Sequence, residues 1–361
     1  MADDITVGTG APTDRSRTRR IWKRVAIVVI VAFAAAFVVQ HHEDVPEAWK
    51  IVRTADLWWL ALAALLTAAW LVNFGLLQAA AQRAAGLPTG PFAVTVPAIA
   101  ANFLNMITKS GGMAGLAMLL TDGRRRGNPR GPVVAAYLLA AALIEMAFGA
   151  TLFVAMLLVW ASDKLTGAEI TASIVFAVYL TVRVGILVVA WRSRHSLRRL
   201  FVLPGRVTAW LRRRPHQPSE HRAADDLHEA MALVRHAPAR SLPTVGHALG
   251  VALLGVLTMW AIMASVGAGH SVIVALVAYS VTVLFTIVGL LPSGVGFVEV
   301  SLAAALVSFG VDGPRTAAIV VLYRIFQLWL PVIAGAVLAP RVRRAGGDPT
   351  ASDGRGVVAA L

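Results

Sequence analysis

Two serine-glycine stretches interrupt apolar segments of the chain, and each has an ionisable residue beside it. The first, in NFLNMITKSGGMAGLAM (102–118), contains Lys109, Ser110, Gly111 and Gly112. The second, LPSGVG (291–296), contains Ser293, Gly294 and Gly296, and Glu299 follows it. Glycine lets backbone N–H groups approach a ligand closely, and the positive end of a following half-helix attracts an anion. The pattern predicts binding of an anionic group such as a lipid phosphate, with Lys109 adding a full positive charge.

Four charged residues fall well inside apolar segments: Glu145, Arg183, Glu299 and Arg324. Each charge costs at least ~2.5 kcal/mol at membrane depth unless it is paired or hydrated. We therefore expect two ion pairs, Glu299 with Arg324 and Glu145 with Lys109. We also expect Glu145, Glu299 and Arg324 to bind the ligand, together with the residues of the two breaks. One alternative is that these pairs only fix helix register. Another is that the glycines only pack helices together, and for Arg183 the alternative is snorkelling to the interface.

The composition places this chain in a membrane. Of 361 residues, 58% are hydrophobic and only 14% are charged, whereas about a quarter of residues are charged in soluble domains. The net charge of +14 does not indicate nucleic-acid binding, because the arginines cluster beside apolar segments, where they report orientation. The absence of cysteine excludes disulfides and thiolate metal sites, and the histidines of segment 192–243 match no metal-ligand spacing. We expect no cofactor and no metal.

The apolar segments predict an all-α polytopic fold with about seven to eight transmembrane helices. They lie at 25–39, 57–80, 133–161, 170–191, 245–266, 272–291 and 316–338. The first is preceded by a basic run, but VQHH (39–42) lacks the small residues of a signal-peptide cleavage site, so we expect a signal-anchor helix. A single transmembrane domain (25–340) is expected between disordered cytoplasmic tails at 1–24 and 341–361. It includes a basic cytoplasmic loop, 192–243, which should face anionic lipid headgroups.

Loop charges orient these segments. Cationic groups at 15–24, 124–130, 192–240 and 341–344 should be cytoplasmic, whereas the acidic residues of 43–56 should lie outside. If Arg83 and Arg124 are both inside, segment 92–120 must enter and leave on one face, as a re-entrant hairpin that turns near Lys109. Segment 272–291 should then run inward and 297–311 should return outward. Both breaks should line a cavity, because irregular backbone at this depth needs protein or water around it.

The residues of the second break also resemble a known family. LPSGVGFVE (291–299), followed by LYR (322–324), WLP (329–331) and Gly335, resembles the lysylphosphatidylglycerol synthase transmembrane region family. The stretch 102–115, then RRRG (124–127) and Glu145, resembles the N-terminal half of that family. Together these motifs cover about residues 50 to 340.

The resemblance implies a lipid-translocating module, which in the full-length synthases is coupled to a soluble aminoacyl-transferase domain. We expect no such domain here, because the chain ends about twenty residues after its last predicted span. We expect a multi-pass protein of a bacterial plasma (inner) membrane, with its N- and C-termini cytoplasmic and with a phospholipid or lipid-linked substrate as its partner.

The combined pattern predicts a lipid transporter or flippase-like protein, and not an enzyme, for an anionic or modified phospholipid or a polyprenyl-phosphate-linked lipid. One alternative is a membrane-embedded, lipid-linked glycosyltransferase that uses Glu43 and Asp44, although the outer connections at 162–169, 267–271 and 312–315 are short for an acceptor cleft. The other is an accessory scaffold for a lipid-modifying enzyme partner. The sequence contains no ATP-binding P-loop motif, so transport would be downhill or coupled to an ion or to the membrane potential.

The charge pattern yields a test of topology in this naturally cysteine-free chain. Single cysteines in Arg83→Cys, Arg125→Cys and Arg214→Cys should be shielded from a membrane-impermeant thiol reagent applied to intact cells, whereas Glu47→Cys should react. Labelling of position 125 from outside would contradict the hairpin.

Overall fold

The chain folds into a bundle of helices. In the computed structural model of the protein, the described residues are 45–160 except Lys109, 238–288 except His270, 292–344, and a few isolated positions between 174 and 232. Within these ranges every regular element is helical: α2 Val45–Arg53, α3 Leu57–Ala84, α4 Thr95–Ile107, α5 Met113–Arg125, α6 Arg130–Trp160, η1 Pro238–Ser241, α10 Leu242–Ser265, α11 Val272–Val288, η2 Pro292–Gly294, α12 Phe297–Ser308, α13 Gly313–Arg324, η3 Ile325–Trp329 and α14 Leu330–Arg344. The predicted segment 25–39 and most of 170–191 and of the loop 192–243 lie outside the described residues.

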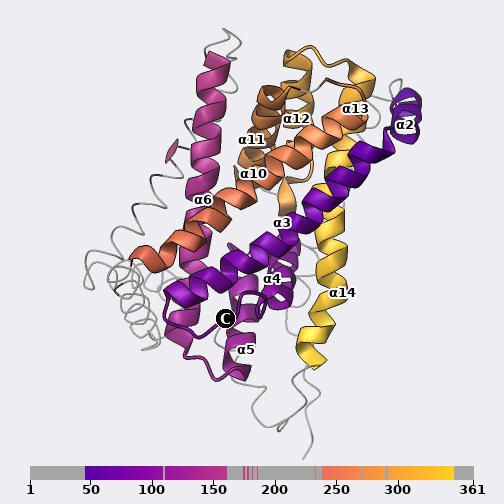
Figure 1. Ribbon diagram of the computed structural model, residues 1–361. Coiled ribbons are helices and arrows are strands. Elements are labelled where there is room, and N and C mark those ends of the chain that lie inside the picture. Colours follow the sequence, from indigo (N-terminus) through magenta and orange to yellow (C-terminus); the bar gives the residue numbers. More distant parts are fainter. Residues whose placement is uncertain are drawn as a thin grey trace, which may run out of the picture.

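Four described helices are long and apolar enough to cross a membrane: Leu57–Ala84, Arg130–Leu158, Ala239–Ser265 and Gly313–Ala339. At 1.5 Å per residue, helices of 27 to 29 residues are roughly 40 Å long, more than the ~30 Å hydrocarbon core, so they have length to spare for tilt. In Figure 1, α3 and α10 run diagonally side by side, whereas α6 and α14 stand more upright. The sequence-predicted polytopic all-α fold is thus confirmed.

Two polar contacts between Asn73 and His247, here called the polar clasp, join the two diagonal helices. The Asn73 side-chain amide donates to the His247 backbone carbonyl at 2.8 Å, and the Asn73 amide oxygen lies 2.8 Å from His247 Nδ1. Gly250 makes room for this clasp, because a Cβ there would lie 3.0 Å from the Asn73 amide nitrogen. Two polar side chains within apolar helices are thereby satisfied by each other.

Two short helical hairpins fill the centre of the bundle. The first hairpin is α4 and α5, of 13 residues each, and the second is α11 and α12, of 17 and 12 residues. Helices of 12 or 13 residues are about 20 Å long and cannot cross the hydrocarbon core. Figure 1 shows the first hairpin in the lower half of the bundle and the second in the upper half. The hairpins predicted from the loop charges are therefore present, and they enter from opposite ends.

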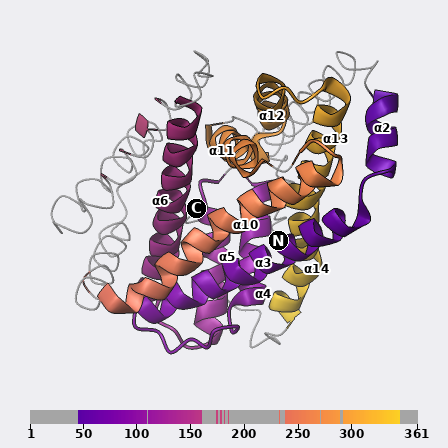
Figure 2. The ribbon, with the colours of Figure 1, turned by 45° about the horizontal axis from the view of Figure 1, so that its top comes forward.

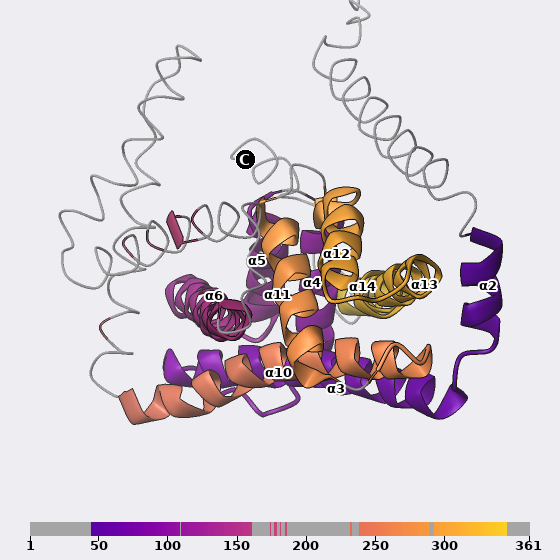
Figure 3. The ribbon, with the colours of Figure 1, turned by 90° about the horizontal axis from the view of Figure 1, so that it is seen from above.

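The surrounding helices hold both hairpins in place. Seen from above, the hairpins lie between α6 on one side and α13–α14 on the other, and α3 and α10 run along a third side, at the lower edge of Figure 3 and in front in Figure 2. The α14 helix packs closely on α4 at Gly335, where any Cβ would overlap the Phe103 side chain. The first hairpin is thus fixed between α14 and the α3–α10 pair.

The last predicted span, 316–338, contains an irregularity that the sequence did not reveal. It begins as α13 and continues as α14, but the two are joined by the π-helical turn η3, in which the Leu330 N–H donates to the Ile325 carbonyl. A π-turn fits one additional residue into the helix and shifts the register of the side chains that follow. The last residue before η3 is Arg324.

Close packing of α3 against the first hairpin makes Gly75 sensitive to substitution. A Cβ at Gly75 would lie 2.7 Å from the Thr95 Cα at the start of α4, so backbone would have to move. Gly75→Ala should lower the melting temperature of the detergent-purified protein. The matched control is Gly246→Ala, because position 246 has open space and alanine favours the helix by up to ~1 kcal/mol. Equal or higher stability of Gly75→Ala would contradict this packing.

Candidate functional site

The second break, residues 292–296, is a sharp turn between α11 and α12. Ser293 (φ 54°) and Gly294 (φ 63°) both adopt the left-handed conformation, which serine rarely adopts. A Cβ at Gly294 would lie 2.9 Å from the Thr286 Cα, so this turn also lies against the backbone of α11. Only glycine can adopt the left-handed conformation without strain and also fit this close to the α11 backbone at position 294. The strained Ser293 backbone costs about 1–3 kcal/mol and persists only where the surroundings impose it.

Arg324 imposes much of that conformation. Its guanidinium donates to both carboxylate oxygens of Glu299, at 2.8 and 2.7 Å. It also donates to the backbone carbonyls of Ser293 at 3.1 Å and Gly294 at 3.3 Å. Four of the five guanidinium N–H donors are thereby used within the protein. The predicted pairing of Glu299 with Arg324 is confirmed, and the pair also satisfies the carbonyl groups of the turn.

We call the Arg324–Glu299 pair, with its bonds to the Ser293 and Gly294 carbonyls, the Arg324–Glu299 clamp. Glu299 connects this clamp to the start of α12. Its carboxylate accepts the Gly296 N–H at 2.6 Å, half of a capping box that a glycine cannot complete. The negative charge lies in the first turn of α12, where the helix macrodipole favours it. The side chains of Arg324 and Glu299 are only 13% and 18% exposed. Loss of one partner would therefore leave a largely buried charge unpaired.

The first break, residues 108–112, is built from side chains that cap α5. The Ser110 hydroxyl accepts the Ala114 N–H at 3.1 Å, and the Asn105 side chain accepts the Gly115 N–H at 2.8 Å. These amides at the positive end of α5 are consequently not available to an anion. Any backbone N–H groups that bind an anion at this break must therefore precede Met113. Binding of an anion by the Gly111 and Gly112 amides stays a prediction.

Tyr137 of α6 closes the first break from the side. Its hydroxyl donates to the Gly112 carbonyl at 2.8 Å and accepts from the Asn105 side chain at 3.1 Å. Gly112 has φ 90°, and a Cβ there would lie 2.7 Å from the Tyr137 hydroxyl. The glycine is thus required both by the conformation and by the close approach of the tyrosine.

The two breaks meet in the middle of the bundle. The Ser293 hydroxyl donates to the Met106 carbonyl at 3.0 Å, which joins residues 187 positions apart in the sequence. Met106 lies in the last turn of α4, where backbone carbonyls lack helical partners. The hairpin tips from opposite ends of the molecule are therefore in direct polar contact, so Ser110–Gly112 and Ser293–Glu299 belong to one central region. Arg324 adjoins this region from the end of α13.

Not every predicted site residue can be placed at this junction. Lys109 and Arg183 lie outside the described residues, so the pairing of Lys109 with Glu145 stays a prediction. Glu145 is half-buried on α6, eight residues beyond Tyr137, or about 12 Å along the helix. Because Tyr137 contacts the first break, Glu145 lies about two turns away from that contact along α6.

Sequence reasoning missed three polar residues that organise the centre. Asn105 and Tyr137 support the first break, and Tyr323 joins α13 to α11 through a 2.8 Å hydrogen bond with Thr282. Each is a polar side chain in an apolar helix, which is a usable signal, but the sequence does not show which partner it meets. The described residues contain no group of three or more His, Asp or Glu placed to hold a metal ion.

The comparison with known families agrees with this architecture. The chain belongs to the lysylphosphatidylglycerol synthase TM region family, whose model matches residues 22–335. That range includes both hairpins, the Arg324–Glu299 clamp and the start of α14. No curated protein and no solved structure matches the chain.

The clamp predicts a strong asymmetry between single and double substitutions. Glu299→Gln or Arg324→Gln alone should lower the abundance and melting temperature of the protein, because removing one partner of a buried pair costs about 3–5 kcal/mol. The double variant should recover part of that loss.

The control for the clamp is Arg315→Gln, which breaks the Asp312–Arg315 pair, whose side chains are both 47% exposed. Exposed pairs contribute roughly 0–1 kcal/mol, so this change should have little effect. A double variant whose loss of stability equals the sum of the two single losses would show that Glu299 and Arg324 act independently.

Proposed function

We propose that this protein binds a phosphate-bearing lipid where its two hairpins meet and moves that lipid across the membrane. The substrate class is an anionic or modified phospholipid, or a polyprenyl-phosphate-linked lipid. The observation that carries the proposal is the contact of Ser293 with Met106, which places two polar, irregular backbone segments together inside an apolar bundle. Membership of a transmembrane family named for a lipid synthase supports a lipid-related role.

A polar headgroup is costly to carry through an apolar layer. Backbone and hydroxyl groups at mid-depth can replace water around a headgroup, and unsatisfied polar groups there cost several kcal/mol each. Short hairpins that enter from opposite ends bring such groups to the centre of the bundle. Discontinuous helices that meet near the midplane are the arrangement by which many transporters bind polar substrates.

The contacts divide the central residues into two roles. Arg324 and Glu299 satisfy each other and the turn around Ser293, so we assign them the role of holding the second break in shape. In the first break, Lys109, Gly111 and Gly112 are the groups we assign to the lipid phosphate. The amides of Ala114 and Gly115 are already bonded within the protein. Lys109 therefore supplies the positive charge that we assign to the lipid phosphate.

Reconstitution into liposomes that contain fluorescent lipids tests this function. The wild-type protein should speed the movement of phosphate-bearing lipids between leaflets, measured by dithionite quenching of the outer leaflet. Lys109→Met should reduce that rate by roughly tenfold or more, as expected for a lost charge-assisted hydrogen bond of about 1.5–3 kcal/mol. Lys109→Arg should be partly active, since a planar guanidinium does not reproduce a compact ammonium.

The control is Lys164→Met, the same change in a predicted outer connection, which should leave the rate unchanged. Wild-type lipid movement by well-folded Lys109→Met protein would remove Lys109 from the site. Absence of movement by the wild-type protein for every headgroup would favour the accessory role beside a lipid-modifying enzyme.

A further inference from the structure

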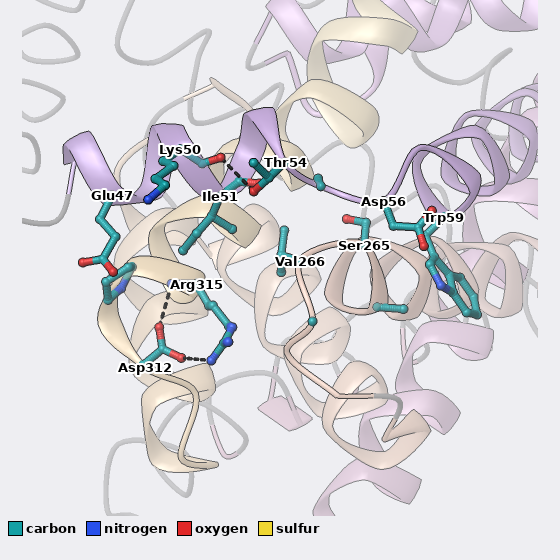
Figure 4. A pocket seen from close by; sticks show the side chains of 14 residues that line it. Glu47, Lys50, Ile51, Thr54, Asp56, Trp59, Ser265, Val266, Asp312 and Arg315 are labelled. Atoms are coloured by element: carbon teal, nitrogen blue, oxygen red, sulfur yellow. Dashed lines mark hydrogen bonds and ion pairs between the residues drawn. The ribbon is translucent and has the colours of Figure 1, made fainter.

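A second polar site lies at one end of the bundle, away from the hairpin junction. An open pocket of about 850 Å³ is lined by α2, the start of α3, the end of α10 and the start of α13. Figure 4 shows Glu47, Lys50, Asp312 and Arg315 gathered at one end of this pocket and Trp59 and Ser265 at the other. We call it the end pocket. It shares no residue with the breaks or with the Arg324–Glu299 clamp.

Three of the five charged residues that line the end pocket already cap a helix or form an ion pair within the protein. Asp56 caps α3 by accepting the Trp58 N–H at 2.8 Å. Asp312 caps α13 by accepting the Arg315 N–H at 3.0 Å, and it also pairs with the Arg315 guanidinium at 2.6 Å. Burial raises the pKa of Asp312, but its bonds with Arg315 outweigh this, so the pKa lies below its usual value and the pair stays ionised.

The two remaining charges that line the end pocket are those of Glu47 and Lys50. Neither has an ion-pair partner among the residues that the structure describes. They are three residues apart on α2, so their Cβ atoms are neighbours at about 5–6 Å on one helix face, and both line the pocket. On the same helix Arg53 does not line the pocket and instead stacks on Trp49, 5.1 Å from the ring centroid. Within the part of the chain that the structure describes, the pocket therefore offers one unpaired anion beside one unpaired cation.

The side chains around the end pocket place it at headgroup depth. Trp49, Leu57 and Trp58 are 54%, 78% and 85% exposed beside it, and exposed tryptophans mark the membrane–water interface. The α3 helix starts at the pocket and carries Arg83 in its last turn, at the far end. The basic residues 124–126 end α5 next to the entry of the first hairpin. By the charge rule, the end pocket lies at the outer leaflet.

We propose that the end pocket binds a group that carries both a phosphate and an amine, with the phosphate on Lys50 and the amine on Glu47. The zwitterionic headgroup of an outer-leaflet phospholipid has this chemistry and this location. The inference rests on the proposed lipid transport and narrows its substrate class to lipids that carry an amine as well as a phosphate.

Binding to the purified full-length protein in detergent tests this site without requiring transport. The probes are short-chain phosphatidylethanolamine, short-chain phosphatidylglycerol, which lacks the amine, and soluble glycerophosphoethanolamine, which lacks the acyl chains. Phosphatidylethanolamine should bind at least about tenfold more tightly than phosphatidylglycerol by titration calorimetry or native mass spectrometry. Glu47→Gln and Lys50→Gln should each weaken its binding by about tenfold. Arg53→Gln, on the same helix but outside the pocket, should leave binding unchanged.

The soluble probe identifies the source of the ligand. Weaker binding of glycerophosphoethanolamine than of the diacyl lipid assigns the pocket to a membrane lipid, and equal binding assigns the same charge recognition to a soluble compound. Equal affinity for the two lipids, or unchanged binding by folded Glu47→Gln and Lys50→Gln proteins, would overturn the proposal. Such a failure would leave the liposome assay of the hairpin junction unaffected, because that assay depends on Lys109.

Discussion

The interaction on which the centre of this protein depends is the set of hydrogen bonds made by Arg324. A turn inside an apolar bundle exposes carbonyl groups that water cannot reach, and a lone carboxylate there would be costlier still. One guanidinium resolves both problems, because it binds Glu299 with two parallel hydrogen bonds and the carbonyls of Ser293 and Gly294 with two more. The position of α12, which starts at this turn, follows from that clamp.

The clamp in turn allows the two hairpins to meet. With Ser293 held in the left-handed conformation, its hydroxyl reaches the Met106 carbonyl of the opposing hairpin. The first hairpin supplies its own support through Asn105 and Tyr137. The polar groups at the centre therefore form most of their hydrogen bonds with other groups of the protein. The structure there would not depend on a bound ligand. The two proposed sites would then act in series, with the end pocket selecting the headgroup at the outer leaflet and the hairpin junction carrying it past the midplane.

The sequence predicted the architecture better than it predicted the contacts. Counting arginine-rich loops required two hairpins, and the cost of unpaired charges in an apolar medium required a partner for Glu299. By contrast, the bond between Ser293 and Met106 joins segments that share no local pattern, and the π-turn at Ile325–Trp329 reads in sequence as an uninterrupted apolar helix. The caps on α5 were also missed, because Asn105 reaches Gly115 only after the chain has reversed direction.

Covalent cross-linking between the hairpin tips tests the central claim most directly. The natural chain has no cysteine, so the variant with Met106→Cys and Ser293→Cys carries thiols at these two positions alone. In native membranes a short bifunctional thiol reagent should link them rapidly, whereas the control variant with Met106→Cys and Ser308→Cys, at the far end of α12, should stay unlinked. No cross-link in the tip variant, when that protein is folded and inserted, would contradict the meeting of the two hairpins.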